Sequence, residues 1–516
     1  MSETSQKKPD YKLIIILLSG AFISFLSNTF LNVALPAIKN DFGISTSAVQ
    51  WVSTSYMLVS GIIIPTTAYL MQKFSARTLF LTAMSLFLLG TIVAGFSPAF
   101  IVLILGRMIQ ASGSAMLMPL LMNIMISSFP PDKRGTAMGL FSLVMFFAPA
   151  IGPTVSGIVV ENYSWHVLFY MMIPLLIIVL VVGFWQLPEI QQKREAHIDI
   201  MSIILSTIGF GGVLYGLSSA GENGLASSSV LIPLLLGIAG ITLYVIRQFK
   251  LEFPMLDFRV YKYPMYTIAS LIIGAANMAL FAGMILIPIF MQDIQGLSPL
   301  DTGLLMLPGA LIMGFMSPVS GKLFDMYGPK TMAITGLALA VVTTFFLSRL
   351  EIDTSFTYLL TIYMIRALGM TMVNTPVMTN GMNSLPAHLT PHGSSLNSML
   401  NQVSGSIGIA LLITVMQTYT NITVNKMDSP TEAMINQATL EGINLAFLVG
   451  TGFLFLALVA AFFLKQSSSA DTIGKSIARA RPINEDKKKI SRDYSLLIFF
   501  VFLFCVKLDN SYNRLR

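Results

Sequence analysis

Charged residues are scarce in this chain. Only 11% of its 516 residues are Asp, Glu, Lys or Arg, whereas a soluble domain carries about 25%. Hydrophobic residues make up 54%, and the mean hydropathy is +0.75. A soluble chain of this length would divide into several cores joined by polar linkers. The composition excludes that class and predicts an all-α polytopic membrane protein.

Cysteine, metal-binding clusters and phosphate-binding loops are also lacking. The single Cys505 excludes a disulfide within the chain. The four histidines (His166, His197, His388 and His392) lie in loops or at the ends of apolar runs, so we expect no metal site. The sequence contains no Walker-type phosphate loop, which argues against ATP as an energy source. We therefore expect no cofactor.

Long apolar runs are abundant. A helix that spans a bilayer needs about 20 mostly apolar residues, and the chain holds fourteen runs of that kind. They cover residues 13–35, 50–71, 78–97, 99–127, 135–160, 166–186, 201–219, 230–249, 267–291, 303–324, 330–350, 356–383, 395–420 and 443–464. The stretch at 496–506, "LLIFFVFLFCV", is too short to span, and we expect a peripheral or disordered tail there.

The positive charges are distributed unevenly between the loops. With the N-terminus inside, cytoplasmic segments hold 26 of the 31 Lys and Arg residues, external loops hold three, and two lie within spans. Cytoplasmic loops retain Lys and Arg, so this bias supports fourteen spans with both termini in the cytoplasm. It also explains the pI of about 9.3 without a nucleic-acid partner.

The two halves of the chain share landmarks. Arg107 and Arg366 are 259 residues apart, and each precedes a patch of small residues. "AYLMQKFSAR" (68–77) aligns with "GKLFDMYGPK" (321–330), and "RGTAMG" (134–139) aligns with "HGSSLN" (392–397). Two six-helix halves therefore flank an inserted pair, and repeats of this kind place a substrate site near the midplane between them.

This repeat predicts four segments. The N-terminal six-helix bundle covers residues 1–190, the inserted pair with its linkers 191–262, the C-terminal bundle 263–465 and a cytoplasmic tail 466–516.

Four motifs resemble the major facilitator superfamily, and in particular its fourteen-helix drug/proton antiporters such as the lincomycin-type exporters of Gram-positive bacteria. They are "LSNTFLNVALP" (26–36), "GKLFDMYGPK" (321–330), "RMIQASGSA" (107–115) and "APAIGPTVSG" (148–157). Two positions depart from the family pattern. Ser27 stands where the first-helix motif usually has an acid, and Gln72 stands where the first-half loop motif usually has an aspartate.

Arg107 lies about eight residues inside an apolar run. A charge inside the membrane is costly and usually faces a cavity, although an arginine that packs between helices and extends to a headgroup is the simpler alternative. Gln110 lies one turn further on the same face. We expect Arg107 to line the transport cavity, and Arg366 holds the corresponding place in the second half.

The resemblance also implies gating residues. Asp325, in the motif that begins at Gly321, is expected to face the start of the fifth span near Arg134 and Gly135, where the helix dipole favours a carboxylate. In "APAIGPTVSG", prolines including Pro153 bend the helix, and Gly152 and Gly157 permit close contact with a neighbour. We expect that motif to form a hinge and seal between the halves.

An amphipathic cavity and a proton site complete the prediction. Polar and aromatic candidates for the cavity are Asn28, Asn32, Gln50, Trp51, Tyr56, Asn277, Asn397 and Asn401. All 24 acidic residues lie in tails, loops or span ends, so a proton would bind near a span end, with Asp293, Glu161 and Glu222 as candidates. The absence of a deep carboxylate predicts neutral, zwitterionic or weakly anionic substrates over dications.

The sequence thus predicts a monomeric, proton-coupled exporter of amphipathic drugs in the bacterial cytoplasmic membrane, whose partners are small amphipathic substrates, protons and the lipid bilayer. A lipid or fatty-acid exporter on the same fold is the alternative. A membrane-embedded enzyme or sensor is disfavoured, because the sequence shows neither a catalytic cluster nor a soluble domain.

Overall fold

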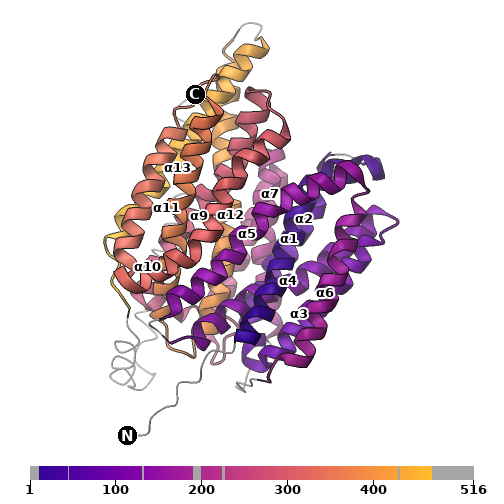
Figure 1. Ribbon diagram of the computed structural model, residues 1–516, viewed down its shortest axis with the longest axis vertical. Coiled ribbons are helices and arrows are strands. Elements are labelled where there is room, and N and C mark those ends of the chain that lie inside the picture. Colours follow the sequence, from indigo (N-terminus) through magenta and orange to yellow (C-terminus); the bar gives the residue numbers. More distant parts are fainter. Residues whose placement is uncertain are drawn as a thin grey trace. The chain divides into compact units, whose positions relative to one another are not determined.

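The computed structural model describes residues 11–44, 46–130, 133–189, 199–223, 227–427 and 431–467. Within those ranges the chain is helical and contains no strand (Figure 1). Residues 468–516 lie outside them, and with them the predicted peripheral stretch at 496–506.

The first half and the inserted pair contain α1 (Tyr11–Phe42), α2 (Thr46–Lys73), α3 (Ala76–Gly95), α4 (Phe100–Ser128), α5 (Arg134–Asn162), α6 (His166–Gln186), α7 (Ile200–Asn223) and α8 (Ser228–Lys250). The remainder contains η2 (Phe258–Lys262), α9 (Pro264–Ile289), η3 (Phe290–Ile294), α10 (Pro299–Leu347), α11 (Phe356–Asn383), α12 (Thr390–Val424) and α13 (Glu432–Ala461).

The helices match the fourteen predicted spans. Twelve helices in the described ranges are long and apolar enough to cross a membrane. α10 is one of these but covers two predicted spans, because its 49 residues bend at Gly328, where φ is +78°. α5 is 29 residues long and supplies the remaining span. A left-handed residue at this bend suits glycine, which has no Cβ to clash with the backbone.

Short polar residues define several helix starts. Ser75 and Ser355 accept hydrogen bonds from the backbone N–H of Thr78 and Tyr358, at the starts of α3 and α11. Ser298 and Asp301 form a capping box at the start of α10. These side chains satisfy N–H groups that have no partner within the helix.

Packing joins helices of one half more extensively than helices of different halves, apart from one seam. In the first half α3 packs on α4 and α6, α2 on α4, and α1 on α5; in the second half α10 packs on α11, and α9 on α12 and α13. The exception is α5, which packs extensively on α10 (Figure 1).

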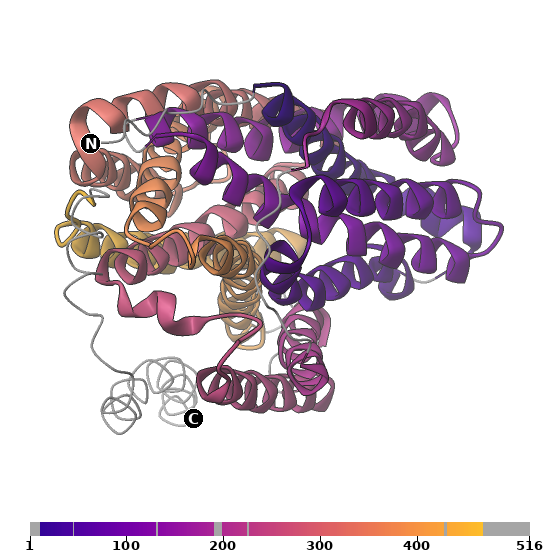
Figure 2. The same cartoon turned by 90° about the horizontal axis from the view of Figure 1, so that it is seen from below.

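The inserted helices α7 and α8 pack mainly on each other. α7 also contacts α2 of the first half and α12 of the second (Figure 2). The inserted pair therefore lies along the seam between α2 and α12, on a different flank from the α5–α10 seam.

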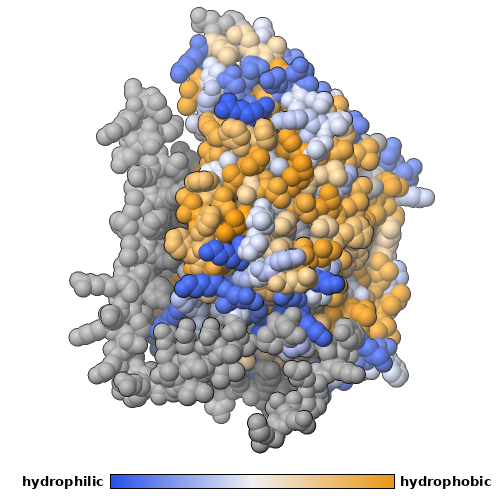
Figure 3. All heavy atoms as spheres, turned by 60° about the vertical axis from the view of Figure 1, so that its left-hand side comes forward, coloured by the Kyte–Doolittle hydropathy of each residue, from blue (hydrophilic) through white to orange (hydrophobic). Residues whose placement is uncertain are grey.

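Apolar side chains are exposed at mid-height on the face of the molecule that Figure 3 shows. They form a broad band there, with polar residues above and below it. Leu235, Leu236, Phe315 and Phe455 are among the large apolar residues exposed on the described surface. Exposed apolar surface of this extent is what a lipid bilayer covers, and the protein is a multi-pass membrane protein.

Candidate functional site

Arg107 lies on α4 inside the first half, and its side chain is 0% exposed. Its Nε donates to Val52 O (3.3 Å), Nη1 to Gln110 Oε1 (2.7 Å) and Nη2 to Asn28 Oδ1 (3.1 Å). The ring of Tyr56 covers the guanidinium at 4.2 Å. α1, α2 and α4 thus surround one charge.

The groups around Arg107 are neutral. Two amide oxygens, a backbone carbonyl and an aromatic face offset part of the cost of burying the charge, through hydrogen bonds and a cation–π contact. Gln110 in turn donates to Thr91 Oγ1 (2.8 Å) and Ser27 Oγ (3.4 Å). The sequence predicted that Arg107 lines a cavity. In this conformation α1, α2 and α4 enclose the guanidinium instead, and it does not face open space.

Arg366 is anchored in the same way inside the second half and is 2% exposed. Its Nε donates to Thr344 Oγ1 (3.1 Å) and its Nη2 to Ala279 O (2.7 Å). In the aligned repeat Gly369 takes the place of Gln110, and Thr344 that of Thr91. Arg366 therefore reaches the threonine directly, whereas Arg107 reaches it through Gln110.

The polar residues predicted to line a cavity fall into separate groups. Asn28 and Tyr56 belong to the Arg107 cluster. Asn277 on α9 donates to Asn401 on α12 (2.6 Å), so these two form a contact within the second half. Asn397 is buried against Met122 of α4. The side chains of Asn32 and Gln50 lie outside the described residues.

Trp51 is the most accessible of the candidates whose side chains the structure describes. Its side chain is 42% exposed, and its ring packs against Tyr215 of α7, with ring centroids 5.8 Å apart. Trp51 therefore also links α2 to the inserted pair.

Asp325 joins the two halves. Its carboxylate accepts hydrogen bonds from Gly135 N (3.1 Å), Thr136 N (3.0 Å) and Thr136 Oγ1 (2.9 Å) at the start of α5. The positive end of the helix dipole favours a carboxylate at this position. We call this end of the bundle the Asp325 end. At it α2 and α4 end, and α5 and α12 begin.

The backbones of α5 and α10 cross closely beside this contact. A methyl group on Gly135 would overlap Asp325 Oδ1 and Gly321 O, and one on Gly321 would overlap Gly135 O. One turn further along α5, a methyl group on Gly139 would lie 2.6 Å from Pro318 Cα. The seam between the halves therefore requires glycine at these positions.

Substitution of Gly135 by alanine should open this seam. We expect Gly135→Ala to reduce transport at least tenfold, since about 1.4 kcal/mol of lost contact changes an equilibrium tenfold. Gly157→Ala on the same helix is the control, because a methyl group added there would meet none of the described atoms within 4 Å. Alanine favours a helix over glycine by about 1 kcal/mol, so the control should be at least as stable as the parent. Equal transport by both variants in membrane vesicles would contradict the requirement for glycine.

The contacts of α5 differ in part from the sequence prediction. Arg134 donates to Asn383 Oδ1 (3.0 Å) and Phe129 O (3.2 Å), which ties the start of α5 to the end of α11. Gly152 does allow a close approach, but to Thr29 of α1 within the first half. The close contact predicted for Gly157 is wrong for the part of the chain that the structure describes, where a methyl group on Gly157 would meet no atom within 4 Å.

The seam between the halves therefore lies at Gly135 and Gly139, nearer the start of α5 than the predicted motif. The side chain of Pro153 lies outside the described residues. Residues that the sequence did not indicate strengthen the seam: Thr375 donates to Ser142 Oγ (2.9 Å), and the rings of Phe147 and Phe315 meet at 5.3 Å.

The predicted proton-coupling acids lie apart from these contacts. Glu161, near the end of α5, and Asp293, in η3, are exposed, and the side chain of Glu222 lies outside the described residues. Their assignment stays a prediction.

The sequence was compared with protein families and with curated proteins. A family model described as Major Facilitator Superfamily matches residues 17–409. An uncharacterized MFS-type transporter of Bacillus subtilis, YhcA, is 45% identical over 82% of this chain and 78% of its own length. The lincomycin resistance protein LmrB of Listeria innocua is 39% identical over 90% of this chain and 98% of its own.

A solved structure has the same fold. The human organic anion transporter MFSD10 superposes with a TM-score of 0.61 over 87% of this chain and 100% of its own, at 12% identity. At that identity the likeness concerns the fold alone.

Proposed function

Because this chain belongs to the major facilitator superfamily, a family of transporters rather than enzymes, we propose that it exports amphipathic drugs from bacteria in exchange for protons. Relatives named for lincomycin resistance and multidrug resistance support the substrate class. The resemblance of its motifs to drug/proton antiporters supports the coupling.

The contact of Asp325 with α5 is the observation that carries the mechanism. Export by alternating access needs a contact between the halves that holds one side closed and can break. Hydrogen bonds from two backbone N–H groups and a hydroxyl to one carboxylate meet both needs, because water can replace them when the halves separate. The repeat supports two bundles, 1–190 and 263–465, as the parts that rock.

The distribution of Lys and Arg supports the orientation. It supports a cytoplasmic location for the Asp325 end and for both termini, and the bacterial relatives support the cytoplasmic membrane as the site of action. The state with Asp325 bound to α5 is then closed toward the cytoplasm. Opening toward the cytoplasm, to load substrate, requires this contact to break.

Substrate charge should follow from the distribution of acidic residues. The sequence places all of them in tails, loops or span ends, so a permanent dication between the halves would lose water without gaining a deep counter-charge. We expect a neutral or zwitterionic amphiphile to be exported at least about tenfold faster than a dicationic dye of similar size. Paired flux measurements in inverted vesicles test this, and faster export of the dication would contradict it.

Proton coupling is tested in the same vesicles. Collapse of the proton gradient should stop export of the preferred substrate while the vesicles remain sealed. Unchanged flux without the gradient would refute coupling and leave the drug-export proposal to be judged by the substrate assay.

A further inference from the structure

The repeat gives Asp325 and Arg134 counterparts where α2 of the first half meets α12 of the second. We call this contact between the halves the second seam. Gln72 occupies the position of Asp325, and His392 that of Arg134. The structure brings these counterparts together: Gln72 Nε2 and His392 Nε2 are 2.9 Å apart, between the end of α2 and the start of α12. The second seam is thus joined at the same end by an amide and an imidazole in place of a carboxylate and helix N–H groups.

His392 is also bonded to the linker between α8 and α9. The backbone N–H of Asp257 donates to His392 Nδ1 at 3.0 Å, and the imidazole is 5% exposed. The ring therefore contacts the first half, the second half and the linker of the inserted pair.

These contacts define the protonation state of the ring. A backbone N–H can only donate, so Nδ1 must accept and carry no proton. A neutral imidazole then has its proton on Nε2, opposite the amide of Gln72. If that amide is turned, its oxygen accepts this proton, and the hydrogen bond that Nε2 of Gln72 donates to Ala68 O (3.2 Å) is given up. A second proton could bind only at Nδ1. It would set two donors opposite each other and break the hydrogen bond to the linker.

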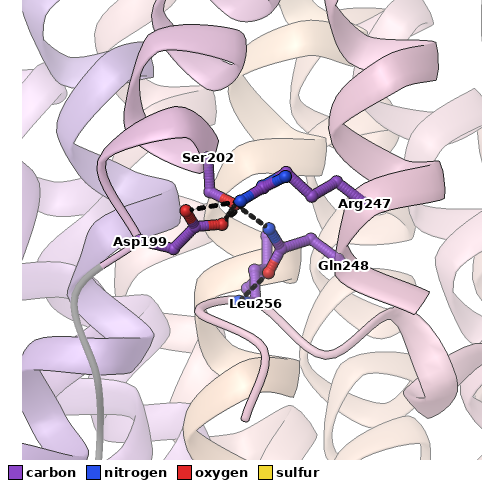
Figure 4. Close-up of polar contacts among 5 residues, drawn as sticks. All are labelled: Asp199, Ser202, Arg247, Gln248 and Leu256. Atoms are coloured by element: carbon purple, nitrogen blue, oxygen red, sulfur yellow. Dashed lines mark hydrogen bonds and ion pairs between the residues drawn. The ribbon is translucent and has the colours of Figure 1, made fainter. Parts of the chain in front are cut away.

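The linker transmits this contact to the inserted helices. Leu256 N donates to Gln248 Oε1 (3.2 Å), Gln248 Nε2 to Ser202 Oγ (2.5 Å), and Ser202 Oγ to Asp199 Oδ2 (2.6 Å) (Figure 4). Arg247 pairs with the same carboxylate at 2.6 Å. The hydrogen bond from Arg247 holds the pKa of Asp199 below its ordinary value, so this pair stays ionised while an imidazole titrates.

A few charged or titratable residues lie on the elements next to the ring. Asp257 and Arg259 form an ion pair on the linker, with N and O 3.8 Å apart. Lys73 follows Gln72 on α2, and Tyr266 on α9 donates to Gly393 O (2.8 Å). The last three turns of α4 and of α11, whose ends lie at the same seam, contain no charged residue.

We propose that His392 is a proton-responsive tie. In its neutral form the ring joins the inserted pair to both halves at the Asp325 end, and protonation at Nδ1 releases the linker from α12. Through this contact the inserted pair makes the second seam sensitive to the pH at the Asp325 end. The twelve helices of the two halves would not do so by themselves. This role is independent of which substrate the protein carries.

The test measures the distance between the linker and the loop before α12. Glu252→Cys and Ala387→Cys are exposed positions for spin labels in the full chain with Cys505→Ser. Pulsed electron paramagnetic resonance at about pH 8 and about pH 5 brackets the titration of a free imidazole near 6.5. We expect a second, longer distance at low pH, its population rising at least about fivefold, which corresponds to one net hydrogen bond.

Two variants separate the tie from other titrating groups. His392→Gln keeps an acceptor for Asp257 N but cannot be protonated, so one short distance should persist at both pH values. His388→Gln removes an exposed imidazole four residues away and should behave as the parent. A pH response in His392→Gln equal to that of the parent overturns the proposal, as does its loss in His388→Gln.

A third variant leaves His392 in place, should His392→Gln fail to fold. Gln72→Glu sets a carboxylate opposite Nε2, which favours the charged ring, so release should occur at higher pH by about one unit. An unchanged midpoint overturns the proposal.

Discussion

Replacement of Asp325 by asparagine should reduce export at least tenfold without loss of expression. The carboxylate uses both oxygens to accept hydrogen bonds from α5. Asparagine offers one oxygen and sets an NH₂ donor against the N–H groups of the helix. Hydrogen bonds to a charged acceptor are worth about 1.5–3 kcal/mol, so the loss changes the ratio of closed to open states by about tenfold or more. Flux in inverted vesicles measures the effect.

A matched control lies on the same helix. Asp301 also accepts hydrogen bonds at a helix start, but from Ser298 at the first turn of its own helix, α10. Asp301→Asn should weaken that cap by about 1 kcal/mol and leave export near the parental rate. Equal export by Asp325→Asn and the parent would remove the gating role.

Replacement of Arg107 by alanine should abolish export and lower stability. The change leaves the oxygens of Gln110 and Asn28 without their donor inside the first half, at a cost of about 1–3 kcal/mol for each unsatisfied group. Arg107→Lys retains the charge but not the planar fork that reaches three acceptors in different directions. We expect partial recovery of export in Arg107→Lys, at about a tenth of the parental rate.

The two effects of Arg107→Ala must be measured separately. Thermal unfolding of the purified variant reports stability, and flux per correctly folded molecule reports transport. Arg349→Ala removes an exposed arginine that stacks on Phe345 and should leave both unchanged. Full export by Arg107→Ala would show that the residue only packs the helices.

Much of the architecture follows from the sequence, because in a bilayer each backbone polar group must be paired within its own helix. A span of about 20 apolar residues is then a local property, and the fourteen predicted runs correspond to the thirteen described α-helices, of which α10 covers two runs. The repeat offsets likewise predicted which residues correspond between halves. Four motifs predicted the family, and the match of the superfamily model to residues 17–409 confirms it.

The contacts between helices could not be predicted from the apolar runs or the repeat. Gly152 and Gly157 look alike in the motif, yet Gly152 faces Thr29, whereas Gly157 has no close neighbour among the described residues. Which glycine meets a helix depends on rotation and tilt, and packing against neighbours sets these, not composition. The sequence placed Asp325 near Arg134 and Gly135, but for the same reason it missed the close approach of Gly139 to Pro318.

The environment of each polar group was the other matter left to the tertiary structure. The sequence determined that Arg107 is an intramembrane charge with Gln110 one turn away; only the fold decided that Asn28, Val52 and Tyr56 enclose it. The sequence likewise marked Gln72 as a departure from the motif, but its meeting with His392, 320 positions away, needed the folded chain. A hydrogen bond forms only between atoms about 3 Å apart. For residues this distant in sequence, the packing of α2 against α12 sets the distance between the two atoms.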